Sequence, residues 1–203
     1  IIAASPVSGS LDNNAGNFLS AYIFSWFNFF SISVGLFTVA ICAYLAAIFV
    51  IGETSNALQR NYFTLKAKEA ILLVVLAGAL VFIAAWVSGI PLFTWIFGGT
   101  IGIVAISLAS ISLWILFKNF NKGKTSLFRI LAGFQVVMIL VAATYSHYPN
   151  IILFKDGTHL SLTEHVAAES TLQSLGWALL LGSVFILPFL VYLIYSFKSR
   201  KMD

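Results

Sequence analysis

The sequence predicts an all-α fold, a polytopic membrane helix bundle with five transmembrane helices. Hydrophobic residues make up 60% of the 203 residues and charged residues only 9%, whereas about a quarter of the residues in a soluble domain are charged. The apolar residues form long continuous runs instead of alternating with polar residues, which favours helices over the strands of a membrane barrel. The basic residues gather in the segments between alternate runs, which is typical of a multi-pass protein.

Five ranges are long and apolar enough to span a membrane, because a helix needs about 20 mostly apolar residues to cross about 30 Å of hydrocarbon. They are residues 27–51, 70–90, 92–117, 127–146 and 174–197. Residues 1–26 are then expected to form an outer segment, and residues 147–173 an outer connector that contains a short helix. Pro188 is expected to kink the last span, since proline removes a backbone donor and crowds the preceding turn.

The basic residues predict an N-terminus outside the cell and a cytoplasmic C-terminus. Ten of the eleven Lys and Arg residues fall on one side of the expected spans, and Lys155 falls on the other. The ten are Arg60, Lys66, Lys68, Lys118, Lys122, Lys124, Arg129, Lys198, Arg200 and Lys201. Because loops rich in Lys and Arg stay in the cytoplasm, the placement of the basic residues indicates orientation, and the formal net charge of +4 does not indicate a nucleic-acid partner.

The third expected span carries a face of small residues: Gly98, Gly102, Ala105, Ala109 and Ser112. Their spacings of four and three residues place them on one side of a helix. Small side chains let membrane helices approach closely, and dispersion then holds the helices together. We therefore expect this face to pack against a neighbouring helix, and we expect the replacement of Gly102 by Leu to impair assembly.

The outer connector holds the three histidines of the chain, His147, His159 and His165. His165 and Glu169 are four residues apart and would share one face of a short helix, for which Ser161 and Glu164 form a capping box. Two ligands are too few for a metal site, and a buried haem needs its ligand inside the bundle. We favour a solvated helix face with a weak His–Glu contact. The sequence therefore predicts no metal-binding and no cofactor-binding residue.

The expected spans carry no catalytic constellation. No Asp, Glu, Lys or His lies at mid-membrane depth, where an ionisable residue would mark a proton or ion path. Gln135 and Thr38 are the most notable interior polar residues, and we expect both to form hydrogen bonds between helices. The sequence therefore predicts no catalytic residue in this chain.

Three stretches of the chain carry a resemblance. The first consists of Asn28, Phe29, Phe30, Gly35, Tyr44, Leu45, Glu53, Thr54, Leu58 and Arg60. The second consists of Tyr148, Pro149, Leu160, Ser161, Leu162, Thr163, Ala167, Ala168 and Leu172, and the third of Leu187, Pro188, Tyr192 and Phe197. In this order they resemble the N-P-F…G…Y-L…T…L…R, Y-P…S-L-T…A-A…L and L-P…Y…F segments of the second subunit of the cytochrome bd family of bacterial quinol oxidases. Phe29 departs from the family's Pro, and Val166 from its Asn or Asp.

The resemblance implies a heterodimer in the bacterial inner membrane that oxidises quinol and reduces dioxygen to water. It implies that haems b and d and the quinol-oxidation site belong to the partner, subunit I. This chain would brace subunit I, would work with the quinone pool in the lipid bilayer, and could hold a quinone as a structural ligand. The resemblance also implies about four further helices upstream of Ile1, so that this chain would be the C-terminal half of the subunit.

Two other classes stay open from the residues alone. A small-molecule transporter or channel subunit would bind its substrate at broken helices near the midplane of the membrane. Pro91 and the glycines around it fit that pattern, although Ile90 and Pro91 fall at the outer ends of two expected helices, where they favour a short turn. A membrane assembly factor for another complex is the third class. Co-purification with a haem-bearing partner would separate these classes.

Overall fold

The computed structural model describes residues 1–12, 15–54, 56–119, 125–163 and 168–199. Among the described residues, five helices are long and apolar enough to cross a membrane: Phe29–Glu53, Leu58–Val87, Thr100–Asn119, Ser126–His147 and Glu169–Leu193. The predicted class, an all-α polytopic membrane protein, is therefore confirmed. The chain divides into two compact units, Ile1–Leu162 and Thr163–Asp203.

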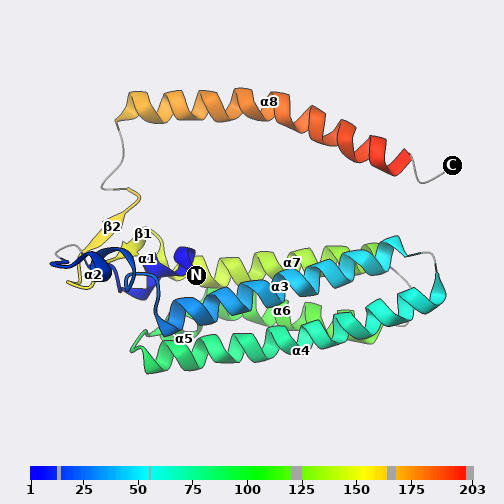
Figure 1. The fold of residues 1–203 in the computed structure, drawn as a ribbon, viewed down its shortest axis with the longest axis horizontal. Coiled ribbons are helices and arrows are strands. Elements are labelled where there is room, and N and C mark those ends of the chain that lie inside the picture. The colour runs from blue at the N-terminus through cyan, green and yellow to red at the C-terminus, as the bar shows by residue number, and fades with distance from the viewer. Residues whose placement is uncertain (13–14, 55, 120–124, 164–167, 200–203) are drawn as a thin grey trace. The chain divides into compact units, whose positions relative to one another are not determined.

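Helices α3 (Phe29–Glu53) and α4 (Ala57–Val87) form a packed antiparallel pair in the first unit (Figure 1). Each helix begins at an asparagine whose side-chain oxygen accepts a backbone N–H. Asn28 accepts from Ser31 at 2.8 Å, and Asn56 accepts from Leu58 at 2.9 Å. Such caps satisfy N–H groups that have no partner within the helix. The helix α4 begins well before the expected span 70–90, because no proline or glycine interrupts residues 57–77.

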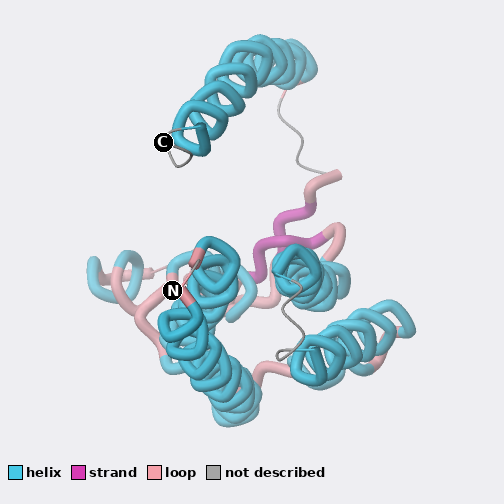
Figure 2. The backbone as a smooth tube through the Cα atoms, turned by 90° about the vertical axis from the view of Figure 1, so that its right-hand side faces the viewer, coloured by secondary structure: helices cyan, strands magenta, loops and turns pink. Residues whose placement is uncertain are grey.

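The expected span 92–117 is divided in the structure into α5 (Leu92–Phe97) and α6 (Thr100–Asn119), with Gly98 and Gly99 between them. The chain turns from α4 into α5 through Gly89, whose φ of 71° lies in the left-handed region that favours glycine. The helix α7 (Thr125–Thr144) packs against α6 and ends in a 3-10 turn, η3 (Tyr145–His147). The long helices of this unit lie alongside one another in both views (Figure 1, Figure 2).

The buried core of the first unit has two parts. One part joins α3, α4, α6 and α7 through Tyr44, Ile48, Ile51, Ala67, Ala70, Ile71, Leu116, Phe128 and Ala132. The other part lies around the start of α3 and contains Ala4, Phe30, Val81, Ala85, Leu92 and Ile96. Many of the buried residues are alanines, so the helices approach closely, as membrane helices do when small residues face each other.

The end of the bundle at which α3 begins carries the non-spanning segments of the first unit (Figure 1). The N-terminal segment contains η1 (Ile2–Ala4), α1 (Ser5–Ser8) and α2 (Phe18–Tyr22). The connector forms an antiparallel hairpin of β1 (Asn150–Leu153) and β2 (His159–Ser161), with Gly157 in its turn at φ 83°. The backbone N–H of Lys155 donates to the carbonyl of Leu11 at 2.8 Å, so the N-terminal segment is tied to this hairpin.

The second unit is dominated by α8 (Glu169–Ser199), which includes the expected span 174–197. It contains Pro188, and Figure 1 shows the helix bending along its course. The short helix expected in the connector falls on residues 164–167, which lie outside the described residues. Its proposed cap, Ser161, is the last residue of β2.

Candidate functional site

The small-residue face expected on the third span lies mostly on α6. Gly102, Ala105, Ala109 and Ser112 are buried, whereas Gly98 is exposed and follows the C-terminus of α5. A Cβ atom at Gly102 would overlap the carbonyl oxygen of Ile96 and lie 3.0 Å from the carbonyl carbon. Because the obstacle is backbone, position 102 accommodates only glycine while α5 keeps its place.

One side chain of α6 and one side chain of α7 each donate a hydrogen bond to a backbone carbonyl of the other helix. The Ser112 hydroxyl donates to the carbonyl of Leu131 at 3.2 Å. The Gln135 amide nitrogen of α7 donates to the carbonyl of Ala109 at 3.3 Å. The small residues of α6 therefore do more than permit close packing, since they leave its backbone within reach of a polar side chain.

The other end of the Gln135 amide contacts α3. The Tyr44 hydroxyl donates to the Gln135 side-chain oxygen at 2.6 Å, and the two residues are only 4% and 6% exposed. One side chain therefore connects α3, α6 and α7 inside the bundle. The prediction of an interhelical hydrogen bond is confirmed for Gln135. It is wrong for Thr38, whose hydroxyl donates to Val34 of its own helix at 2.8 Å.

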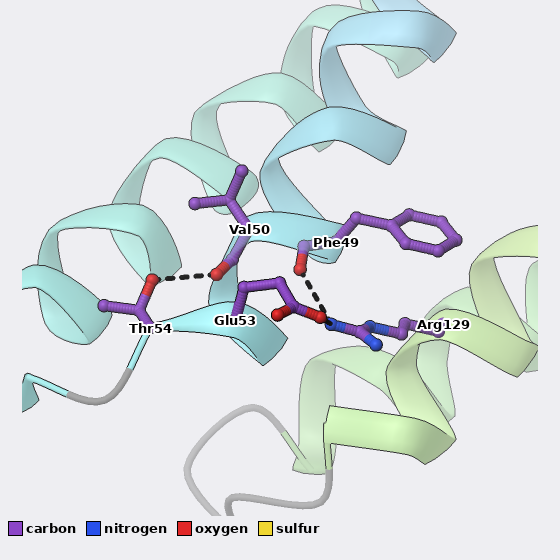
Figure 3. Close-up of polar contacts among 5 residues, drawn as sticks. All are labelled: Phe49, Val50, Glu53, Thr54 and Arg129. Atoms are coloured by element: carbon purple, nitrogen blue, oxygen red, sulfur yellow. Dashed lines mark hydrogen bonds and ion pairs between the residues drawn. The ribbon is translucent and has the colours of Figure 1, made fainter. Parts of the chain in front are cut away.

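A second polar contact joins α3 and α7 at the end of the bundle where α3 ends. We call this the basic end, because five basic residues lie towards it: Arg60, Lys66, Lys68, Lys118 and Arg129. Figure 3 shows Arg129 of α7 reaching the last turn of α3. Its Nη2 donates to the Phe49 carbonyl at 3.1 Å and to Glu53 Oε1 at 2.9 Å. A cation at a helix C-terminus is favourable, because the carbonyl groups there carry partial negative charge.

Gly52 provides the space for this arginine. A Cβ atom at position 52 would overlap the Arg129 guanidinium, with the Nε atom at 2.8 Å. The guanidinium also lies 5.5 Å from the centre of the Phe49 ring. The sequence analysis used Arg129 only as one of the ten basic residues that indicate orientation, and it did not predict the contacts of Arg129 with Phe49 and Glu53.

The connector histidines are not brought together in the described residues. The His147 ring packs edge-on against Trp95 with ring centres 4.3 Å apart, and His159 is exposed at the start of β2. His165 lies outside the described residues, so its expected contact with Glu169 does as well. The described residues contain no group of three or more His, Cys, Asp or Glu that could hold a metal ion. Of the two described histidines, His147 is the last residue of the apolar stretch Ser126–His147, and His159 lies in the hairpin.

The turn of the hairpin carries a well-defined carboxylate contact. The Thr158 hydroxyl and backbone N–H both donate to Asp156 Oδ1, at 2.6 and 3.0 Å. These hydrogen bonds hold the pKa of Asp156 below its ordinary value, because they stabilise the ionised carboxylate. Asp156 is exposed, so this contact shapes the turn and offers no shielded site for chemistry.

A comparison with known families gives one result that covers almost the whole chain. The model of the family described as cytochrome bd terminal oxidase subunit II matches residues 1–197. Comparisons with curated proteins and with solved structures gave no match. The family match agrees with the five apolar helices and indicates a multi-pass protein of the bacterial inner membrane that works with a partner subunit in a terminal oxidase complex. The chain belongs to the cytochrome bd terminal oxidase subunit II family.

Proposed function

We propose that this chain is an accessory, non-catalytic subunit that braces a haem-bearing subunit I during quinol oxidation and the reduction of dioxygen to water. The observation that carries the proposal is that three polar side chains inside the bundle form hydrogen bonds between helices. Tyr44, Gln135 and Ser112 are bonded to one another or to backbone carbonyls of neighbouring helices. Side chains engaged in this way hold helices together and are not presented to a substrate.

Haems b and d belong, in this proposal, to subunit I, and electrons come from the quinone pool. Haem would supply the oxygen chemistry, while the residues of this chain support its binding partner. The placement of His147 at the end of η3, and of His159 in the hairpin, supports this division, because a haem inside the bundle needs a ligand from the helices. A quinone held as a structural ligand is compatible with the same role.

Purification tests the proposal directly. The chain isolated with its partner is expected to show haem absorption and quinol-dependent oxygen uptake, whereas the chain expressed alone is expected to show neither. A stoichiometric haem band on the chain alone would overturn the accessory role. Flux of a small solute through vesicles containing the chain alone would favour the transporter class, and co-isolation with a complex that has no oxidase activity would favour the assembly-factor class.

The orientation of the chain is part of the same proposal. The basic residues support an outside N-terminus and a cytoplasmic C-terminus. A reporter fused after Asp203 tests this orientation. Fluorescent protein is expected to be bright and alkaline phosphatase inactive at this position, and the reverse pattern would invert the topology.

A further inference from the structure

The interior amide of Gln135 has two bonds that point to different helices. Its oxygen accepts from Tyr44 of α3 at 2.6 Å, and its nitrogen donates to the Ala109 carbonyl of α6 at 3.3 Å. Gln135 is 6% exposed, so water has little access to either end of the amide. The two bonds together relate the position of α7 to both neighbours at once.

These bonds are position-specific in a way that the apolar contacts are not. A shift of α7 by one residue moves a side chain by about 1.5 Å along the axis and rotates it by roughly 100°. Such a shift would remove both partners of Gln135, and an unpaired buried amide is costly where no water replaces the bond. The surrounding core consists of residues such as Ala132, Ile48 and Leu116, whose contacts are non-directional.

The hydrogen-bond chain is suited to position helices and not to carry protons. It starts at the Tyr44 hydroxyl, passes through the Gln135 amide and ends on the peptide carbonyl of Ala109. Neither a neutral side-chain amide nor a peptide carbonyl takes up and releases a proton readily. A second hydrogen bond joins α6 to α7, from the Ser112 hydroxyl to the Leu131 carbonyl. Leu131 lies one turn from Gln135 along α7.

We infer that Gln135 is the positioning residue that fixes the register of α7 against α3 and α6. A single polar residue that specifies helix register at some cost in stability is well attested in coiled coils. The inference is independent of whether the subunit is accessory or catalytic, because it concerns the arrangement of its own helices.

The test separates register from stability with near-isosteric variants. Gln135→Met keeps the volume and removes both bonds, and Tyr44→Phe removes only the hydroxyl. Each single variant leaves buried groups unpaired and is expected to lower the thermal stability of the assembled complex. The double variant Tyr44→Phe/Gln135→Met removes the polar pair together, so it is expected to recover most of that stability.

Register itself is measured by pulsed electron paramagnetic resonance on the full chain in its complex. Spin labels at Val39 of α3 and Val137 of α7 are suitable because these side chains are 67% and 52% exposed. Cys42 is exposed and is replaced by Ser to avoid labelling. The wild-type sequence is expected to give one narrow distance population. Both variants that contain Gln135→Met are expected to show a second distance population. In that population α7 has slipped by one turn, which is about 5 Å along its axis.

The ratio of the two populations is expected to change by about threefold to tenfold, which is the range for a hydrogen bond between membrane helices. Thr38→Val is the matched control, because among the described residues the Thr38 hydroxyl bonds within α3, to the Val34 carbonyl. The inference stands if the double variant regains stability and still shows two populations. It is overturned if Gln135→Met and the double variant both keep the single wild-type distance population. It is also overturned if Thr38→Val produces a second population as large as that of Gln135→Met.

Discussion

The interior of the bundle and its basic end both join helices of the first unit, but with different kinds of contact. Inside, the contacts use neutral groups and rigid backbone: Gln135 donates to the Ala109 carbonyl, and Gly102 lies against the Ile96 carbonyl. At the basic end, Arg129 meets Glu53 through side chains that are 31% and 58% exposed. Charged side chains therefore join the helices where the side chains are partly exposed, and a neutral amide joins them where the side chains are buried.

This difference also predicts how each region responds to mutation. A rigid interior contact offers no alternative position, so its disruption must move a helix. A flexible side chain at the basic end can rotate into water at small cost, because exposed ion pairs contribute little to stability. Three experiments test this contrast and a fourth concerns the hairpin turn. They are given from the largest expected effect to the smallest.

Gly102→Leu is expected to have the largest effect, because its side chain would displace the backbone of α5 at Ile96. We expect a loss of stability of about 3 kcal/mol, at the upper end of the range for overpacking, and a lower yield of the haem-bearing complex. Gly133→Leu is the control, since no atom of the described residues lies within 4 Å of a Cβ atom at that position of α7. Equal yields of the two variants would show that the α5–α6 contact is not rigid.

Tyr44→Phe is expected to have the next largest effect, because it leaves the buried oxygen of Gln135 without its donor. The expected loss is about 1 kcal/mol, which is typical of an unsatisfied buried polar group. Thermal unfolding of the purified complex measures it. Thr38→Val, which removes a hydroxyl bonded within its own helix, is expected to change the melting temperature less.

Gly52→Ala is expected to have a smaller effect, even though its Cβ atom would overlap the Arg129 guanidinium. The guanidinium is the free end of a flexible side chain and can move away from α3. The loss, relative to Gly133→Ala, is expected to be about 0.5 kcal/mol and to shrink with added salt. A loss as large as that of Gly102→Leu would remove the distinction between the two regions.

The smallest effect is expected for the stability of the hairpin turn when the pH is lowered. The pKa of Asp156 is lower in the folded state than its ordinary value of 3.8. The contribution of its contact with Thr158 is therefore present above pH 3.8 and is lost as the pH falls through the folded pKa. Hydrogen exchange of the turn, corrected for the intrinsic effect of pH, is expected to rise over that range. In Asp156→Asn the exchange is expected to show no such pH step.

The sequence was sufficient to predict the helices but not their partners. Continuous apolar runs such as 27–51 identify a span because the hydrocarbon core demands length and low charge. The same runs conceal which face packs inside, since the lipid-facing side is also apolar and no polar face marks the exterior. The burial of Ala105 and Ala109 could be predicted from the spacing of small residues, but the identity of α7 as their neighbour could not.

The polar contacts show the same limit at the level of single residues. Gln135 and Thr38 look alike in the sequence, as isolated polar residues within apolar spans. A threonine hydroxyl is short and readily bonds the carbonyl four residues back, as Thr38 does with Val34. The longer Gln135 side chain reaches two other helices. The division of 92–117 was missed although the adjacent Gly98 and Gly99 are a local signal for a helix break. The β1–β2 hairpin also depends on pairing between its strands.

The link between Leu11 and the hairpin has a consequence for how this protein tolerates change. Because the bond from Lys155 to Leu11 uses main-chain atoms, and Leu11 pairs with Phe154 in a parallel bridge, almost any side chain could stand at these positions. The number of residues in the turn between Phe154 and Thr158 is constrained instead, since the backbone N–H of Phe154 donates to the Thr158 carbonyl at 2.9 Å and closes the turn. Homologues should therefore differ freely in composition here while keeping loop length nearly constant.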